Sequence, residues 1–162
     1  MGTQVITIRR TVEQADVERI RSITESTGFF YREEVDTAVE LIEDRLQKGP
    51  RCGYHFLFAE EDGETVGYTS YGPIACTRTS FDLYWIVVAG EFRGKGLGKR
   101  LLEASESAIR DLGGNRVYIE TSMRELYEPT RAFYLARGYT AVAVLDDFYA
   151  PGDAKVIYLK VI

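Results

Sequence analysis

The sequence predicts a layered α/β or α+β fold, in which helices pack on a sheet. Apolar residues recur at helical spacing in several segments, and short runs of β-branched and aromatic residues lie between them. Glycine or proline separates most of these segments, as is typical of turns and helix ends. In chain order we expect a strand, two helices, three strands, a helix, a strand, a helix and two strands.

The N-terminal half is expected to fold into a strand, two helices and three further strands. Thr11 and Gln14 have the spacing of a capping box, which predicts that the first helix opens at Thr11 and runs to about Ser26. The pair Asp62-Gly63 predicts a tight hairpin turn between two strands. The expected strands are 5–8, 54–60, 65–74 and 80–88, and the second helix is 35–48.

In the C-terminal half, glycine and proline set the predicted ends of the elements. Gly113 and Gly114 close a helix that begins at Leu97. Pro129 suits the first turn of a short helix, and Gly138 suits the position just past its end. The expected strands are 116–121, 139–145 and 155–161, and turn-forming residues at 150–153 join the last two.

Length and composition favour a single domain over residues 1–162, since 162 residues with 45% hydrophobic residues can bury one core. Cys52 and Cys76 lack metal-ligand spacing, so we expect no metal site, no disulfide framework and a cytoplasmic location. A net charge of −5 argues against a nucleic-acid partner. The apolar stretches are too short for a membrane span, so we expect a soluble protein.

A glycine-rich segment, residues 93–98 with the sequence RGKGLG, lies between an expected strand and an expected helix. Backbone N–H groups at a helix start bind anions, and glycine lets a phosphate approach the backbone closely. Arg93 and Lys95 add positive charge. The spacing fits neither the Rossmann motif nor the Walker A motif, and a simple tight turn is the alternative interpretation. We predict a phosphate-binding loop.

Two motifs resemble those of the GNAT acyltransferases. The sequence EFRGKGLGKRLL at 91–102 is similar to the family's pyrophosphate-binding motif, and TRAFYLARGY at 130–139 is similar to the family's late helix. The two motifs follow one another along the chain as they do in the family. The expected order of helices and strands also agrees with the family's fold. The resemblance implies the GNAT fold, with a central, mostly antiparallel mixed sheet of about seven strands flanked by about four helices. It also implies an acetyl-CoA-dependent N-acetyltransferase.

In the family, the strand before the glycine loop offers backbone groups to the pantetheine arm of acetyl-CoA. Many relatives have an Asn that touches this arm where the present chain has Tyr127. For the strand residues 86–88, ordinary burial is the alternative to cofactor binding. For Arg131, an exposed position on a helix is the alternative. The cofactor-binding residues that the resemblance implies are Ile86, Val87, Val88, Arg93, Gly94, Lys95, Gly96, Leu97, Gly98, Lys99, Tyr127 and Arg131.

The implied reaction transfers acetyl directly to a neutral primary amine and therefore needs a proton acceptor. Glu120 resembles the base of protein N-terminal acetyltransferases and is the leading candidate, with Asp82 on the preceding strand as its rival. A solvated carboxylate is the alternative for both. Tyr134 matches the family's general acid, which protonates the leaving CoA thiolate, and core packing is its alternative.

The resemblance implies that the acceptor is a small amine, an amino acid or the amino group of a peptide or protein, and a fold alone does not choose among these. Aromatic residues on the acceptor side would suit an apolar or peptide group, and simple core packing is their alternative. A non-catalytic CoA-binding sensor or structural module is the alternative to an enzyme, and a homodimer is left open. The expected acceptor-binding residues are Phe29, Phe30, Tyr31, Tyr84, Phe148 and Tyr149.

Overall fold

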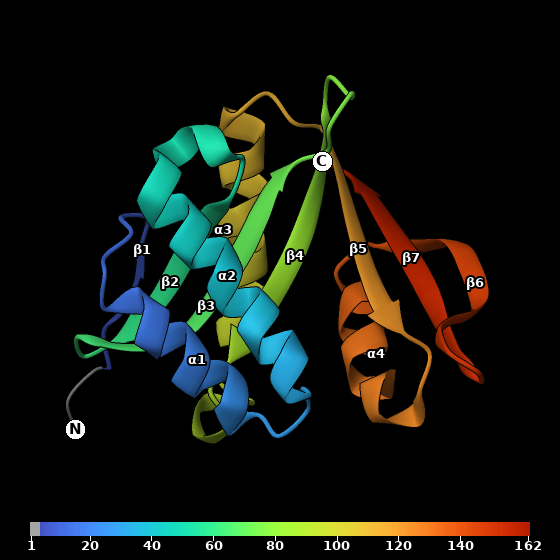
Figure 1. The fold of residues 1–162 in the computed structure, drawn as a ribbon, viewed down its shortest axis with the longest axis horizontal. Helices are drawn as coiled ribbons and strands as arrows, with labels where there is room; N and C mark the ends of the chain where they lie inside the picture. The colour runs from blue at the N-terminus through green and yellow to red at the C-terminus, as the bar shows by residue number, and fades with distance from the viewer. Residues whose placement is uncertain (1–3) are drawn as a thin grey trace. The chain divides into compact units, whose positions relative to one another are not determined.

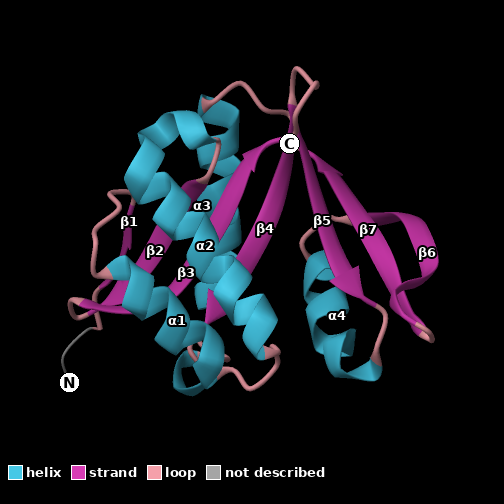
Figure 2. Ribbon diagram, in the orientation of Figure 1, coloured by secondary structure: helices cyan, strands magenta, loops and turns pink. Residues whose placement is uncertain are grey.

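The computed structural model describes residues 4–162; the first three residues of the predicted domain lie outside the described ones. Seven strands form a mixed sheet in the order β1-β2-β3-β4-β5-β7-β6, together with four α-helices (Figures 1 and 2). The β4–β5 pair is parallel, and the β1–β2, β2–β3, β5–β7 and β6–β7 pairs are antiparallel. The predicted order of elements and the mostly antiparallel mixed sheet are confirmed.

The helices and strands have well-defined bounds. The strands are β1 Ile6–Arg9, β2 His55–Glu61, β3 Glu64–Pro73, β4 Ser80–Val88, β5 Arg116–Ser122, β6 Thr140–Ala150 and β7 Asp153–Val161. The helices are α1 Asp16–Ser26, α2 Arg32–Lys48, α3 Leu97–Asp111 and α4 Glu128–Ala136, with short 3-10 turns at Gly49–Cys52, Gly90–Phe92 and Glu125–Tyr127.

The chain divides into two compact units. The first unit comprises Met1–Gly72 and Trp85–Ala108, and the second comprises Pro73–Tyr84 and Ile109–Ile162. Strand β4 contributes its first residues to the second unit and its last residues to the first. Among the described residues, no helix has the length and apolar character that crossing a membrane requires.

In the first unit, helices cover both faces of β3. The Tyr68 hydroxyl shares a 2.7 Å hydrogen bond with Thr24 of α1, whereas the next residue, Thr69, shares a 2.8 Å hydrogen bond with Ser105 of α3. Successive strand residues point to opposite faces, so α1 and α3 lie on opposite sides of this strand (Figure 1). The core on the α1 and α2 side includes Ile20, Ile23, Ala38, Val39, Ile42, Phe56 and Phe58.

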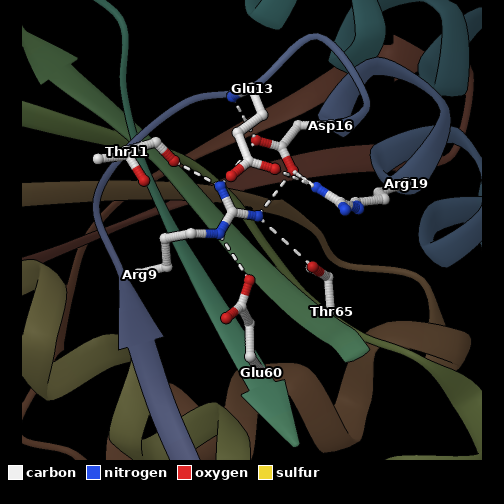
Figure 3. A network of polar contacts seen from close by, with 7 residues as sticks. All are labelled: Arg9, Thr11, Glu13, Asp16, Arg19, Glu60 and Thr65. Carbon is white, nitrogen blue, oxygen red and sulfur yellow. Dashed lines mark hydrogen bonds and ion pairs between the residues drawn. The ribbon is translucent and has the colours of Figure 1, made fainter. Parts of the chain in front are cut away.

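A polar network in the first unit joins the start of α1 to β1 and β2 (Figure 3). The Arg9 guanidinium donates to both oxygens of the Asp16 carboxylate, at 2.7 and 2.9 Å, and to Glu60 at 2.6 Å. Asp16 also accepts hydrogen bonds from the Glu13 backbone N–H and from Arg19. Burial by itself would raise the pKa of Asp16, but these hydrogen bonds outweigh burial and lower it.

This network explains why the predicted start of the first helix is wrong. The structure begins α1 at Asp16, and the carbonyl oxygen of Thr11 accepts a hydrogen bond from Arg9 instead of from a helical N–H. No side-chain hydrogen bond caps α1 at its first residue, so the capping box expected from Thr11 and Gln14 is absent there. A tertiary contact with β1 therefore overrides the local signal.

The sixth strand is longer than predicted. It runs to Ala150 instead of ending at Leu145, and its register with β7 shifts between these two residues. Asp147 has a φ of +53° in this irregular part, and its carboxylate accepts a 2.7 Å hydrogen bond from the Gly152 N–H. The strand therefore carries Phe148 and Tyr149, which the sequence placed before a turn.

Candidate active site

The predicted phosphate loop forms a turn directly before α3 in the first unit. Gly94 and Gly96 have φ values of +76° and +78°, which side chains other than glycine adopt only with strain. The position of a Cβ atom at either glycine is open space. The glycines are thus required by the backbone conformation of the turn, and a ligand has room to approach.

Two cations of this loop, Arg93 and Lys95, lie at the surface. The Arg93 guanidinium lies over the Phe29 ring at 4.3 Å, and the Lys95 ammonium lies over the Phe92 ring at 4.8 Å. Within the part of the chain that the structure describes, neither Arg93 nor Lys95 forms an ion pair. Lys99, by contrast, lies 3.8 Å from Glu103. The residues present therefore fit a phosphate-bearing ligand such as coenzyme A.

The end of β4 presents backbone groups in an alternating pattern. The Ala89 N–H donates to the carbonyl oxygen of Val66 on β3 at 2.8 Å. Because strand residues alternate, the backbone groups of Val87 also point toward β3, whereas those of Ile86 and Val88 point away from it. The hydrogen-bonded ladder between β4 and β5 covers Ser80–Asp82 and Arg116–Tyr118, so Ile86 and Val88 lie beyond it.

The second unit brings two predicted carboxylates and an unpredicted lysine together. The Lys155 ammonium on β7 lies 2.5 Å from Glu120 Oε2 and 3.8 Å from the centre of the Phe148 ring. Burial raises the pKa of Asp82 to about 6, Glu120 adds to the rise, and Lys155 opposes it. This cluster therefore contains a carboxyl that titrates close to neutral pH.

Tyr134 lies in an aromatic cluster of the second unit. Its ring centre is 5.5 to 5.9 Å from those of Phe133, Tyr139 and Tyr158. Burial raises the pKa of the Tyr134 hydroxyl well above its usual range, and Tyr158 adds to the shift. Among residues 4–162 no hydrogen-bond partner of this hydroxyl is found. The hydroxyl therefore stays protonated at neutral pH and retains its capacity to donate.

The two remaining residues predicted to bind the cofactor lie near the start of α4. Arg131 donates hydrogen bonds to the carbonyl oxygens of Ser122 and Arg124, at 2.9 and 2.8 Å, and so holds the turn between β5 and α4. The Tyr127 ring lies 5.4 Å from the Arg124 guanidinium. Arg131 thus has a structural role in this turn, and its contact with a CoA phosphate stays a prediction.

The predicted acceptor residues fall into two groups. In the first unit, Phe29 contacts Arg93, Phe30 packs edge-on against Trp85 at 5.1 Å, and Tyr31 is exposed at the start of α2. In the second unit, the rings of Phe148 and Tyr149 meet edge-on at 5.1 Å and are about half exposed, and Tyr84 is partly exposed. Tyr31 is thus the exposed member of the first group, whereas all three members of the second group are exposed.

Lys155 joins this carboxylate cluster, and no local pattern in the sequence marks it. A lysine in a β-rich segment is ordinarily a solvated charge, and only the pairing of β7 with β5 and β6 reveals its partners. Among residues 4–162, no cluster of three or more His, Cys, Asp and Glu side chains is arranged to hold a metal ion.

Comparison with known families decides the identity of the fold. The model of the acetyltransferase (GNAT) family matches residues 17–139, which is more than half of the chain. The chain belongs to the GNAT acetyltransferase family. The predicted membership is confirmed. The segment that matches the GNAT model contains the glycine loop, Asp82, Glu120 and Tyr134, whereas Phe148 and Lys155 lie beyond its end.

Several GNAT relatives resemble this chain closely. A solved structure of a GNAT-family protein from Desulfovibrio desulfuricans is 44% identical, with a TM-score of 0.95 over 97% of this chain and 99% of that one. An N-alpha-acetyltransferase of Sulfurisphaera tokodaii is 30% identical over 108 residues, which are 60% of this chain and 64% of that protein. The matches span 64% and 66% of the lengths of two curated relatives.

A more distant solved structure is similar to this chain in fold only. The PaiA N-acetyltransferase of Thermoplasma acidophilum, in complex with coenzyme A, is 19% identical. Its TM-score is 0.72, over 98% of this chain and 99% of that one.

Proposed function

We propose that this GNAT-family chain binds acetyl-CoA at residues 93–98 and transfers the acetyl group directly to a primary amine. The observation that carries the proposal is the backbone of the loop, where Gly94 and Gly96 have positive φ immediately before the N-terminus of α3. Such a turn favours a pyrophosphate, through backbone N–H groups and the positive end of the helix. Arg93 and Lys95 add attraction for the phosphates.

The end of β4 is suited to the rest of the co-substrate. The backbone groups of Ile86 and Val88 point away from β3 and are assigned to the amide groups of the pantetheine arm. An N–H group on this side can also donate to the thioester oxygen, which becomes negative when the amine attacks. The geometry favours Ile86 and Val88 over Val87 for this role, because the groups of Val87 point toward β3.

Acetyl transfer requires a neutral amine. At pH 7, a lysine-like amine is neutral in about one molecule in 10³, and an α-amino group in roughly one in ten. The amine nitrogen attacks the thioester carbon and the C–S bond breaks. The proton of the attacking nitrogen passes to the carboxylate pair of Asp82 and Glu120, and the departing sulfur takes a proton from the Tyr134 hydroxyl.

The raised pKa of Tyr134 has two consequences for its proposed role in protonating the departing sulfur. The hydroxyl is fully protonated at neutral pH, so a donor is always present. It is also a weaker acid than an ordinary phenol. Tyr134 is therefore assigned a hydrogen bond to the sulfur as negative charge develops there, with the proton transferred late.

An α-amino group is the acceptor class that we favour. The Sulfurisphaera tokodaii relative is an N-alpha-acetyltransferase, and this supports the α-amino group of a peptide or protein over a lysine side chain. The exposed rings of Phe148 and Tyr149 suit the apolar part of a peptide. The cytoplasmic location expected from the cysteine content agrees with such an acceptor and stays a prediction.

Isothermal titration calorimetry with coenzyme A tests the binding site. Gly96→Asp places a carboxylate against the pyrophosphate and should weaken binding roughly 100-fold or more, about 3 kcal/mol. Gly63→Asp is the matched control, because Gly63 also has positive φ with open space beside it, but lies in the β2–β3 turn. Equal affinities in Gly96→Asp and the parent protein would refute the loop as the binding site.

A screen for thiol release from acetyl-CoA then tests the reaction. The panel contains a peptide with a free α-amino group, an N-terminally blocked peptide with one lysine, and a small polyamine. We expect the first to be the best acceptor. Binding of coenzyme A without turnover of any acceptor would support a non-catalytic CoA-binding module instead.

A further inference from the structure

Lys155 is a charged residue in an almost buried position of the second unit. It lies on β7, where it pairs in register with Ser122 of β5 and Leu145 of β6, and its side chain is 10% exposed. An ammonium group that is withdrawn from water needs compensating partners. The identity of those partners therefore indicates what the residue does.

Two groups contact the Lys155 ammonium. Glu120, diagonal to it on β5, places Oε2 at 2.5 Å, and the Phe148 ring of β6 lies under the ammonium with its centre at 3.8 Å. The ammonium thus bonds to a carboxylate of one neighbouring strand and rests on an aromatic face of the other. These two contacts fix the position of the Lys155 ammonium. The ion pair in turn fixes the position of the Glu120 carboxylate.

Asp82 belongs to the same cluster of charged residues. It pairs in register with Tyr118, two residues before Glu120, and this alternation puts the two carboxylates on the same face of β4 and β5. Over residues 4–162, the Asp82 side chain forms no ion pair or hydrogen bond. The charged groups that act on it are Glu120 from β5 and Lys155 from β7. The ammonium is therefore bonded to Glu120, and it acts on Asp82 only electrostatically.

We propose that Lys155 is a positioning residue that keeps Glu120 in an ion pair and so leaves Asp82 as the carboxylate that takes the proton of the acceptor amine. The proposal rests on the proposed acetyl transfer. If Glu120 accepted the proton, its O–H bond would form at the expense of the 2.5 Å ion pair between its half-exposed carboxylate and a nearly buried ammonium, which would then lack its counter-charge. When Asp82 accepts it, the N–H bond of the acceptor breaks, an O–H bond forms on Asp82, and the Lys155–Glu120 pair persists.

The proton affinity of Asp82 supports this division of roles. Its pKa of about 6 makes it mostly ionised at neutral pH and still a stronger base than an ordinary aspartate. Lys155 opposes this rise, so its ammonium also prevents Asp82 from becoming too basic to be ionised. Loss of the ammonium would leave two carboxylates facing each other, which titrate as a coupled pair.

Carboxyl ¹³C NMR titration of the ligand-free chain tests the proposal without any turnover. Spectra of Asp82→Asn and Glu120→Gln assign the two signals. In Lys155→Met, which keeps the length of the side chain but removes its charge, the titration midpoint of Asp82 should move upward by about 0.5–1 pH unit. Lys155→Arg, which keeps the charge, should leave it near that of the parent. An unchanged midpoint in Lys155→Met, or equal shifts in both variants, would overturn the proposal.

The pH dependence of kcat/KM with a true acceptor provides the second test. The parent should show a rising limb near pH 6, because the base works only when ionised. Asp82→Asn should lose this limb, and Glu120→Gln should keep it at a lower pH, since the neighbouring negative charge is gone. A limb lost in Glu120→Gln and kept in Asp82→Asn would make Glu120 the base. Because the NMR titration needs no substrate, failure of the proposed function would be seen separately.

Discussion

Tyr134 illustrates how much one buried hydroxyl depends on its surroundings. Its ring is fixed among Phe133, Tyr139 and Tyr158, while the hydroxyl lacks a hydrogen-bond partner over residues 4–162. A hydroxyl that bonds no protein group is available to donate a hydrogen bond to a ligand. The proposed donation to the CoA sulfur would satisfy this hydroxyl.

We expect Tyr134→Phe to lower kcat by roughly 10- to 10³-fold, because the variant loses the hydroxyl that is proposed to donate to the sulfur. The ring remains, so the melting temperature should stay close to that of the parent. Steady-state kinetics with a working acceptor measures the change. Tyr139→Phe removes a hydroxyl from the same cluster and is the control. Equal rates in Tyr134→Phe and the parent would reduce Tyr134 to a packing residue.

At the scale of elements, the Arg9–Asp16 pair joins β1 to the first turn of α1. The Asp16 side chain is fully buried and that of Arg9 is 13% exposed, and Arg9 also reaches Glu60 of β2. Removing one partner of a buried pair leaves the other charge uncompensated, which costs far more than loss of a surface pair. The position of α1 therefore depends on this carboxylate.

Asp16→Asn should destabilise the first unit by about 3 kcal/mol. The pKa of Asp16 is lowered below 3.8 in the folded chain, so its stabilising contribution is present above about pH 4 and is lost as the pH falls through the lowered pKa. The parent should therefore lose stability on acidification more steeply than Asp16→Asn. Urea unfolding at several pH values, followed by the fluorescence of Trp85 in the same unit, measures both effects.

Glu13→Gln is the control for this experiment. Glu13 bonds Arg19 in the same network, but the two side chains are 51% and 39% exposed. An exposed pair contributes little, so the variant should lose less than about 1 kcal/mol. A loss of similar size in both variants would mean that burial of Asp16 does not decide its contribution.

At the scale of the whole molecule, the proposed roles are divided between the two compact units. The first unit contains the glycine loop and the end of β4, and the second contains Asp82, Glu120, Lys155 and Tyr134. Residues of both units lie within the segment that matches the GNAT family model. The prediction that residues 1–162 form a single domain stays a prediction.

Binding of coenzyme A should stabilise the unit that contains the loop. At a ligand concentration of about 100 times Kd, linkage adds about 2.7 kcal/mol, which corresponds to a rise of roughly 5–10 °C in melting temperature for a chain of this size. Trp85 fluorescence reports the transition of the first unit. Adenosine, which lacks the pyrophosphate, should have little effect, and Gly96→Asp should abolish the shift. A full shift in Gly96→Asp would place the ligand elsewhere.

The sequence by itself determined the order of elements and the place of the glycine loop. Both depend on local chemistry: periodic apolar residues set the helices and strands, and glycines at 94 and 96 occupy backbone positions with positive φ. Local signals failed where a distant partner competed with them. The capping box predicted at Thr11 does not form. Arg9 bonds to Asp16 instead, and α1 begins at Asp16, later than predicted.

Only the tertiary structure decided which charges meet. Lys155 follows Glu120 by 35 residues, and their ion pair exists because β7 lies beside β5 in a particular register. The pKa of Asp82 near 6 likewise arises from burial and from a carboxylate on another strand. Electrostatic interactions depend on distance and solvent exposure, and neither quantity is a local property of the chain. The sequence therefore supplied the candidate carboxylates, and strand pairing supplied the lysine that distinguishes them.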